Sequence, residues 1–135
     1  MNRSMLLAAL TSLLVAMSAC GGAQLTAPTT PTPPPQTEIF SGTLSRNGAA
    51  THAFSSQAGG TVTATMTSLS PSVVVGLSLG TWNGIACQIV IANDNAVVGT
   101  TTTGTASAVG NLCVRIYDTG QFTSATSYEV SVLHP

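Results

Sequence analysis

Few side chains in this sequence could take part in catalysis or bind a metal ion. The chain has two histidines, His52 and His134, and four acidic residues: Glu38, Asp94, Asp118 and Glu129. His52 has no second histidine, cysteine or acid at a metal-binding spacing, and its neighbours in the pattern are apolar. We therefore expect His52 to pack at a sheet end and His134 to mark the end of a strand. We predict no metal site and no cofactor.

Two of the acidic residues lie in short motifs that could suggest chemistry. Asp94 stands between two asparagines, but a calcium ion requires about six to eight oxygen ligands, several of them carboxylates. Asp118-Thr119-Gly120 resembles the Asp-Thr-Gly of aspartic proteases, whose chemistry needs two carboxylates that share a proton. Only one copy is present. We interpret both motifs as turns, and we predict no catalytic residue.

The charge of the chain excludes another class of function. Charged residues make up 5% of the sequence, the formal net charge is −1, and there is no lysine. Proteins that bind nucleic acid neutralise phosphates with basic side chains, so we expect no nucleic acid partner. Arg115 should lie on the outer face of its strand, where Asp118 or Glu129 could pair with it.

The N-terminus has the features of a bacterial export signal. Arg3 provides a positive charge, and residues 5–17 form an apolar stretch too short to span a bilayer comfortably. The following Ser18-Ala19-Cys20-Gly21 resembles the bacterial lipobox, in which the cysteine is diacylated and becomes the new N-terminus. Met17 stands where that family usually has leucine. The alternative is an ordinary secretory signal cut near Ala19, with an unmodified Cys20.

The sequence divides into three parts. Residues 1–19 are interpreted as a lipoprotein signal peptide, and residues 20–36 as a linker that holds five of the seven prolines. Such a proline-rich segment favours extended polyproline II structure. Residues 37–135 form the folded domain. By resemblance to lipoproteins of Gram-negative bacteria, Gly21 after the cysteine implies outer-membrane attachment where the host has two membranes.

Short strand patterns fill the folded domain and are separated by turn residues. The strongest covers residues 112–117, where Leu112, Val114 and Ile116 alternate with three other residues, and we expect it to be a central strand. The eight predicted strands are residues 38–44, 50–55, 61–67, 73–79, 85–92, 97–106, 112–117 and 127–133. Arg46-Asn47-Gly48 predicts a hairpin turn. The predicted fold is all-β, a two-sheet antiparallel sandwich of jelly-roll or Greek-key type, with a closed barrel as the alternative.

Several segments together resemble the bacterial pre-peptidase C-terminal domain, a β-sandwich of secreted enzymes and surface proteins. They are Phe40–Leu44, Phe54 with residues 58–62, Leu77–Leu79, Gly110–Asp118 and Tyr128–Val132. The resemblance covers nearly all of residues 37–135. His52 stands where the family usually has an aromatic residue. The family often has an acidic residue before the leucine of residues 73–79, so its absence here argues against a family-type calcium site.

The two remaining cysteines, Cys87 and Cys113, are expected to form a disulfide, because export places the chain where thiols oxidise. The side-chain alternation alone opposes this pairing. Cys87 shares a predicted inward face with Ile85, Ile89 and Ile91, whereas Cys113 alternates with the inward set of its strand. A β-bulge or a strand-end position would reconcile the two.

Exposed aromatic residues are the candidate ligand contacts. Trp82 lies in a predicted loop, Tyr117 faces outward on the central strand, and Phe122 lies in the last loop. Aromatic rings of this kind stack on sugar rings, although Tyr117 could equally be a packing residue. We predict a lipid-anchored, non-catalytic binding module of the bacterial cell envelope for a glycan or a protein surface. The alternative is a structural or assembly component of the envelope that self-associates.

Overall fold

The structure of the protein, a computed structural model, describes residues 27–135. The predicted signal peptide, Cys20 and the first part of the linker lie outside the described residues. Residues 27–35 contain no helix or strand and are almost all exposed, as expected for a proline-rich linker. The first strand begins at Gln36, one residue before the predicted domain boundary. The described residues contain no helix long and apolar enough to cross a membrane.

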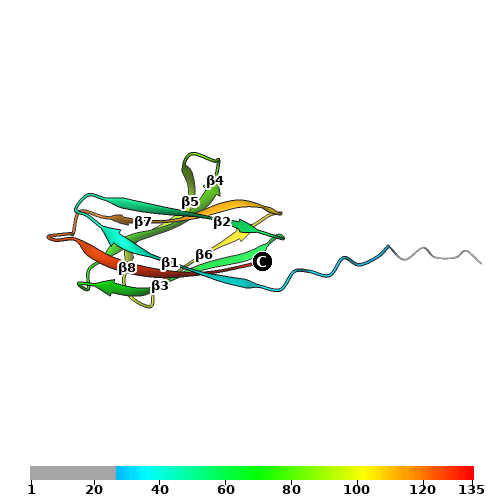
Figure 1. Ribbon diagram of the computed structural model, residues 1–135, viewed down its shortest axis with the longest axis horizontal. Coiled ribbons are helices and arrows are strands. Elements are labelled where there is room, and N and C mark those ends of the chain that lie inside the picture. The colour runs from blue at the N-terminus through cyan, green and yellow to red at the C-terminus, as the bar shows by residue number, and fades with distance from the viewer. Residues whose placement is uncertain (1–26) are drawn as a thin grey trace, which may run out of the picture. The chain divides into compact units, whose positions relative to one another are not determined.

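Eight β-strands form two four-stranded antiparallel sheets that pack face to face (Figure 1). The strands are β1 (Gln36–Leu44), β2 (Ala49–Ser56), β3 (Gly60–Ser70), β4 (Val75–Trp82), β5 (Cys87–Ala96), β6 (Thr101–Ala106), β7 (Gly110–Asp118) and β8 (Thr126–His134). One sheet has the order β1-β8-β3-β6, and the other has the order β2-β7-β4-β5. The predicted two-sheet β-sandwich is confirmed. All eight strands and the buried core lie between Gln36 and His134, so residues 27–135 hold the complete sandwich.

The apolar residues that alternate along each strand fill the space between the sheets. On β7, Val114 and Ile116 are fully buried, and β7 lies inside its sheet between β2 and β4, as predicted for a central strand. The facing residues of β3 and β8 are also buried: Val62, Ala64, Met66, Tyr128, Val130 and Val132. Burial of these side chains is the main force that holds the two sheets together.

The turn after β1 is not the hairpin that the Asn-Gly sequence predicts. β1 and β2 belong to different sheets, so the turn carries the chain from one layer to the other. Asn47 adopts the left-handed conformation with a φ of 57°, which asparagine tolerates better than most residues. The turn also meets the end of β7, because Asp118 donates its backbone N–H to the carbonyl oxygen of Gly48 at 2.9 Å.

A β-bulge in β5 changes which side chains face inward. Leu79 pairs with Ile91, but the next residue of β4, Gly80, pairs with Ile89, so Val90 is the extra residue. Ile91 therefore shares the inner face with Leu79, whereas Ile89 and Cys87 lie on the outer face. The prediction that Ile85, Cys87, Ile89 and Ile91 share one inward face is wrong.

The disulfide between Cys87 and Cys113 is present, with 5.7 Å between the two Cα atoms. The bulge at Val90 gives Cys87 the same outward direction as Cys113, which reconciles the two alternations. Since β4 lies between β5 and β7, this bond crosses the outer side of β4, close to Gly80. A side chain at Gly80 would overlap the backbone of Gln88, so the close passage of β5 requires glycine there.

Candidate functional site

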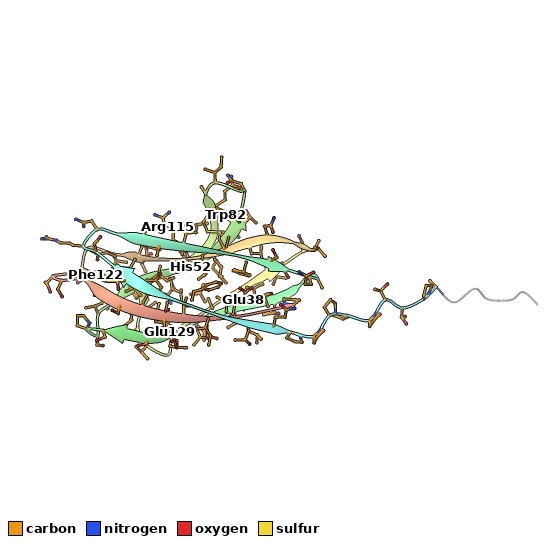
Figure 2. The ribbon with its side chains drawn as sticks, in the orientation of Figure 1. Glu38, His52, Trp82, Arg115, Phe122 and Glu129 are labelled. Atoms are coloured by element: carbon orange, nitrogen blue, oxygen red, sulfur yellow. A yellow bond between two sulfur atoms is a disulfide. The ribbon has the colours of Figure 1, made fainter. Side chains whose placement is uncertain are left out.

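His52 is a packed strand residue, as the sequence predicts. Its ring stacks on Phe40 with 4.8 Å between the centroids, and its Nε2 atom lies 2.7 Å from the hydroxyl oxygen of Tyr128. Burial lowers the pKa of the His52 imidazole below its usual value, because the charged form loses solvation. Burial therefore favours the neutral ring, and the two rings beside it, those of Phe40 and Tyr128, are aromatic. Figure 2 places His52 between the two sheets.

His134 does more than mark the end of a strand. Its side chain is fully buried, and its Nε2 atom lies 3.0 Å from a carboxylate oxygen of Glu38. Its other ring nitrogen lies 3.1 Å from the carbonyl oxygen of Pro135, and its ring packs 5.0 Å from that of Phe54. The contact between His134 and Glu38 therefore connects β8 to β1.

Asp118 is a turn residue, as predicted. Its carboxylate accepts backbone N–H groups from Asn47, Gly120, Gln121 and Phe122 at 2.8–3.2 Å. Partial loss of solvation raises the pKa of the carboxyl, but the four hydrogen bonds outweigh this effect and hold its pKa below the usual value. The carboxylate thus ties the end of β7 to the turn between β1 and β2.

Phe122 is not a surface residue, and its prediction as an exposed ligand contact is wrong. Its side chain is 3% exposed and belongs to the hydrophobic core. The Asp118 turn bends the chain back over the end of the sandwich and holds the Phe122 backbone at 3.2 Å. The ring then enters the core, where burial of an aromatic side chain is strongly favourable.

Ser78 lies in a Gly-x-Ser-x-Gly sequence, Gly76–Gly80, so a prediction that the chain lacks this motif is wrong. In hydrolases this pattern forms a sharp turn between a strand and a helix, with an exposed serine. Here it lies inside the continuous strand β4, and Ser78 is fully buried. Its hydroxyl donates to the carbonyl oxygen of Arg115 at 3.2 Å, so it is a structural serine.

Tyr117 faces outward, as predicted. It lies beside an open polar depression on the outer face of the β2-β7-β4-β5 sheet. The depression has a volume of about 510 Å³, and its lining residues are Val74, Asp94, Asn95, Tyr117, Thr119 and Gln121. They come from the end of β7, the loop after it, the start of β4 and the bulged end of β5. Carboxylate, amide, hydroxyl and aromatic groups therefore meet in one place.

The ring of Tyr117 lies across β4 at Gly76, its register partner. A Cβ atom at Gly76 would overlap the ring, which shows that the ring rests directly on the glycine. Beyond β4, the Tyr117 hydroxyl donates a hydrogen bond to the carboxylate of Asp94 on β5. Burial of the hydroxyl, together with this bond and the negative charge of Asp94, raises the pKa of Tyr117 to about 12. The phenol stays protonated and its ring orientation is fixed.

Arg115 lies on the outer face of β7, as predicted, next to Tyr117. Its guanidinium carbon is 6.0 Å from the centroid of the Tyr117 ring, so a cation borders that ring. The predicted pairing with Asp118 or Glu129 is wrong, because within residues 27–135 the one acidic side chain that lies within 4 Å of a basic or histidine side chain is Glu38, beside His134. Glu129 instead accepts the hydroxyl of Thr67 at 2.8 Å.

No protein-family model and no curated protein matches the chain. The likeness to the pre-peptidase C-terminal domain therefore stays a prediction. Within residues 27–135, no three histidine, cysteine or acidic side chains come close enough together to hold a metal ion.

Trp82 lies at the end of β4, away from Tyr117. Tyr117 pairs with Gly76, and Trp82 is six residues further along the same strand, a separation of about 20 Å at roughly 3.3 Å per residue. The two aromatic residues therefore do not form one continuous platform. Trp82 is partly exposed and pairs with Cys87 at the base of the β4–β5 hairpin.

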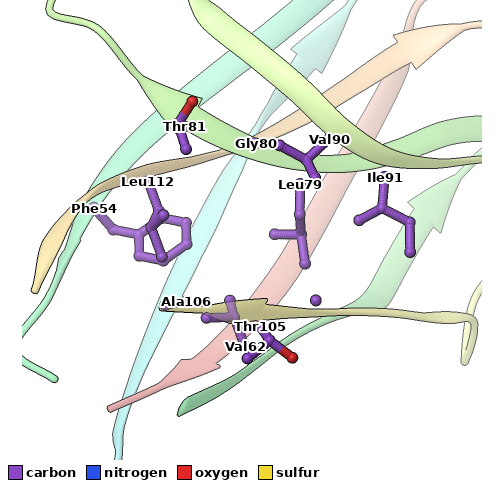
Figure 3. A pocket seen from close by; sticks show the side chains of 11 residues that line it. Phe54, Val62, Leu79, Gly80, Thr81, Val90, Ile91, Thr105, Ala106 and Leu112 are labelled. Carbon is purple, nitrogen blue, oxygen red and sulfur yellow. The ribbon is translucent and has the colours of Figure 1, made fainter. Parts of the chain in front are cut away.

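A second hollow lies where the two sheets meet at the edge strands β5 and β6. It is an apolar cleft of about 70 Å³, lined by side chains that include Phe54, Val62, Leu79, Ile91 and Leu112 (Figure 3). This volume is close to that of a single apolar side chain and is continuous with the core. Its lining offers almost no polar group to orient a ligand, so the Tyr117 depression is the better candidate site.

Proposed function

We propose that this protein is a non-catalytic glycan-binding module of the bacterial cell envelope. Its Cys20 would carry the lipid anchor, at the outer membrane where the host has two membranes. The linker would connect the sandwich to the lipid anchor, and the depression beside Tyr117 would bind the ligand. The observation that carries the proposal is the Tyr117 ring, which lies flat on Gly76 beside four polar side chains.

The chemistry of the depression suits a sugar. A pyranose presents an apolar face of C–H groups and a rim of hydroxyls, so it is recognised by an aromatic ring together with hydrogen-bonding side chains. Tyr117 supplies the ring, while Asp94, Asn95, Thr119 and Gln121 supply acceptors and donors. The ring is already held by Gly76 and Asp94, so little side-chain entropy is lost on binding.

An uncharged glycan fits better than an anionic one. Asp94 is the single ionised side chain that lines the depression, and its negative charge would repel a sugar carboxylate. Arg115 borders the ring and can offset part of that charge. Because few charges act over long distances, binding of a neutral glycan should be nearly independent of salt concentration.

A panel of neutral and anionic oligosaccharides, measured by titration calorimetry on residues 27–135, tests the proposal. We expect binding of a neutral glycan, at least a tenfold loss with Tyr117→Ala, and little change between 0.1 and 0.5 M salt, since stacking on one aromatic ring is worth about 1–3 kcal/mol. Trp82→Ala is the matched control and should bind as the wild type does. Failure of every glycan to bind, or turnover of any of them, would refute the proposal.

The structural alternative rests on a different observation, the exposed apolar edge of β5. Unpaired edge strands can pair with another copy of the same chain. However, β5 contains two irregularities in its register, at Val90 and between Asn93 and Ala96, and bulges of this kind turn an edge away from such pairing. A monomeric mass in analytical ultracentrifugation at high concentration would count against self-association.

A further inference from the structure

The hairpin between β4 and β5 projects from the outer face of the sandwich. Figure 1 shows the strands rising away from their sheet at this point, and Figure 2 places Trp82 on the projecting part. The connection is short, since β4 ends at Trp82 and β5 begins at Cys87. The Cys87–Cys113 disulfide joins the base of the hairpin to β7, so the projection is held in place.

The projecting hairpin exposes apolar side chains to an unusual degree. Ile85 at the turn is 89% exposed and Val90 is 77% exposed, while Ile89 and Trp82 are also partly exposed. Single exposed apolar residues are common on soluble proteins, but a group of them on one projection marks an interaction surface. Neither the core nor the Tyr117 depression uses these side chains.

No charged residue opposes the transfer of this hairpin out of water. The sequence has no Asp, Glu, Lys or Arg between Arg46 and Asp94, so β4, the turn and β5 as far as Asn93 are uncharged. Ionised side chains are the groups that make entry into a bilayer most costly.

The turn also satisfies three of its backbone N–H groups. The side-chain oxygen of Asn83 accepts the N–H groups of Ile85 and Ala86 at 2.9 and 2.8 Å, and the N–H of Asn83 donates to the carbonyl oxygen of Ala86 at 3.3 Å. Backbone groups that lose water without gaining a partner cost several kilocalories per mole inside lipid. At this turn, the exposed tip can leave water with three of its N–H groups already bonded.

We propose that the β4–β5 hairpin inserts its tip, Trp82 to Ala86, into the interfacial region of a lipid bilayer. A bilayer accommodates a small convex apolar tip without a complementary pocket, whereas a stable protein interface buries roughly 800 Å² per partner over a broader surface. Tryptophan at the base of such a tip matches the headgroup region, where its ring and N–H are both well accommodated. The insertion does not depend on a lipid at Cys20 or on the glycan site.

Trp82 is the only tryptophan of the chain, so its fluorescence reports directly on this hairpin. Residues 27–135, without a lipid anchor, are mixed with vesicles of pure phosphatidylcholine and with vesicles that contain one quarter phosphatidylglycerol. We expect the emission to shift to shorter wavelength and to be quenched by phosphatidylcholine brominated near the headgroup. Both vesicle types should give the same affinity at 0.1 and 0.5 M salt, because the hairpin carries no charge.

A matched pair of variants separates insertion from general adsorption. Ile85→Ser removes the most exposed apolar side chain of the tip and should weaken vesicle binding at least fivefold. Ile39→Ser removes the same side chain from β1, where it is 64% exposed, and should have no effect. Neither residue is part of the core, so both variants should fold. Absence of the spectral shift, an equal loss in both variants, or binding to anionic vesicles alone would overturn the proposal.

Discussion

Loss of the disulfide should destabilise the sandwich by about 3.5 kcal/mol. Cys87 and Cys113 are 26 residues apart, and the entropy of closing a loop of that length in the unfolded chain gives roughly 12 cal/mol/K, or about 3.5 kcal/mol at 25 °C. For a domain of this size, that change corresponds to a fall in Tm of about 15–25 °C. The loss should also free the base of the β4–β5 hairpin, since the bond connects Cys87 of β5 to the interior strand β7.

Urea denaturation of residues 27–135 measures this effect in one protein, with the disulfide intact and after reduction and alkylation of both thiols. A second comparison with the Cys87→Ala/Cys113→Ala variant controls for the bulk of the alkylating group. Free thiols are titrated in the unfolded, non-reduced protein to establish the starting state. Two free thiols, or a difference in the free energy of unfolding below about 1 kcal/mol, would show that the cross-link adds little to the sandwich.

Three other changes test the packing on which the two proposed surfaces depend. Gly76→Ala should displace the Tyr117 ring, lower the free energy of unfolding by about 1–3 kcal/mol and weaken glycan binding, as urea denaturation and calorimetry would show. Ile116→Ala removes a fully buried side chain of β7 and should cost about 2–5 kcal/mol, measured by urea denaturation; a cost below 1 kcal/mol would contradict the assigned core. Burial lowers the pKa of His52, so its imidazole binds a proton more readily in the unfolded chain than in the folded protein. The contribution of His52 to stability should therefore be complete above about pH 6.5 and decline as the pH falls below that value. Urea midpoints measured at pH 8, 6.5 and 5 should therefore fall less steeply in His52→Gln than in the wild type. An unchanged slope would show that another group causes the pH dependence.

The strands could be predicted because alternation with a period of two is a local property of the sequence. Residues 112–117 alternate cleanly, and the structure buries Val114 and Ile116 as that pattern requires. The pairing of strands is not local. Nothing near Asn47 shows that the turn after β1 changes sheets, because an Asn-Gly turn suits a hairpin equally well.

The errors at the candidate site have two physical causes. An inserted residue puts the residues on its two sides out of step, so the bulge at Val90 leaves Cys87 and Ile89 facing outward although the apolar pattern places them with Ile91. The carboxylate of Asp118 holds the loop after β7 in the position that buries Phe122. The alternation of residues along the strands does not reveal this contact. His134 was underestimated because its partner, Glu38, is distant in the sequence.

Two glycines of β4 explain how one strand can support both proposed surfaces. The Tyr117–Asp94 hydrogen bond crosses the outer side of β4 at Gly76, and the Cys87–Cys113 bond crosses it near Gly80. Each link joins β7 to the edge strand β5. A Cβ atom at Gly76 would overlap the Tyr117 ring, and a Cβ atom at Gly80 would overlap the backbone of Gln88 on β5. The first link fixes the ring of the glycan site, and the second fixes the base of the hairpin. Since the links lie four residues apart on a single strand, changes at one glycine should affect its own surface first, and the two proposals can be tested independently.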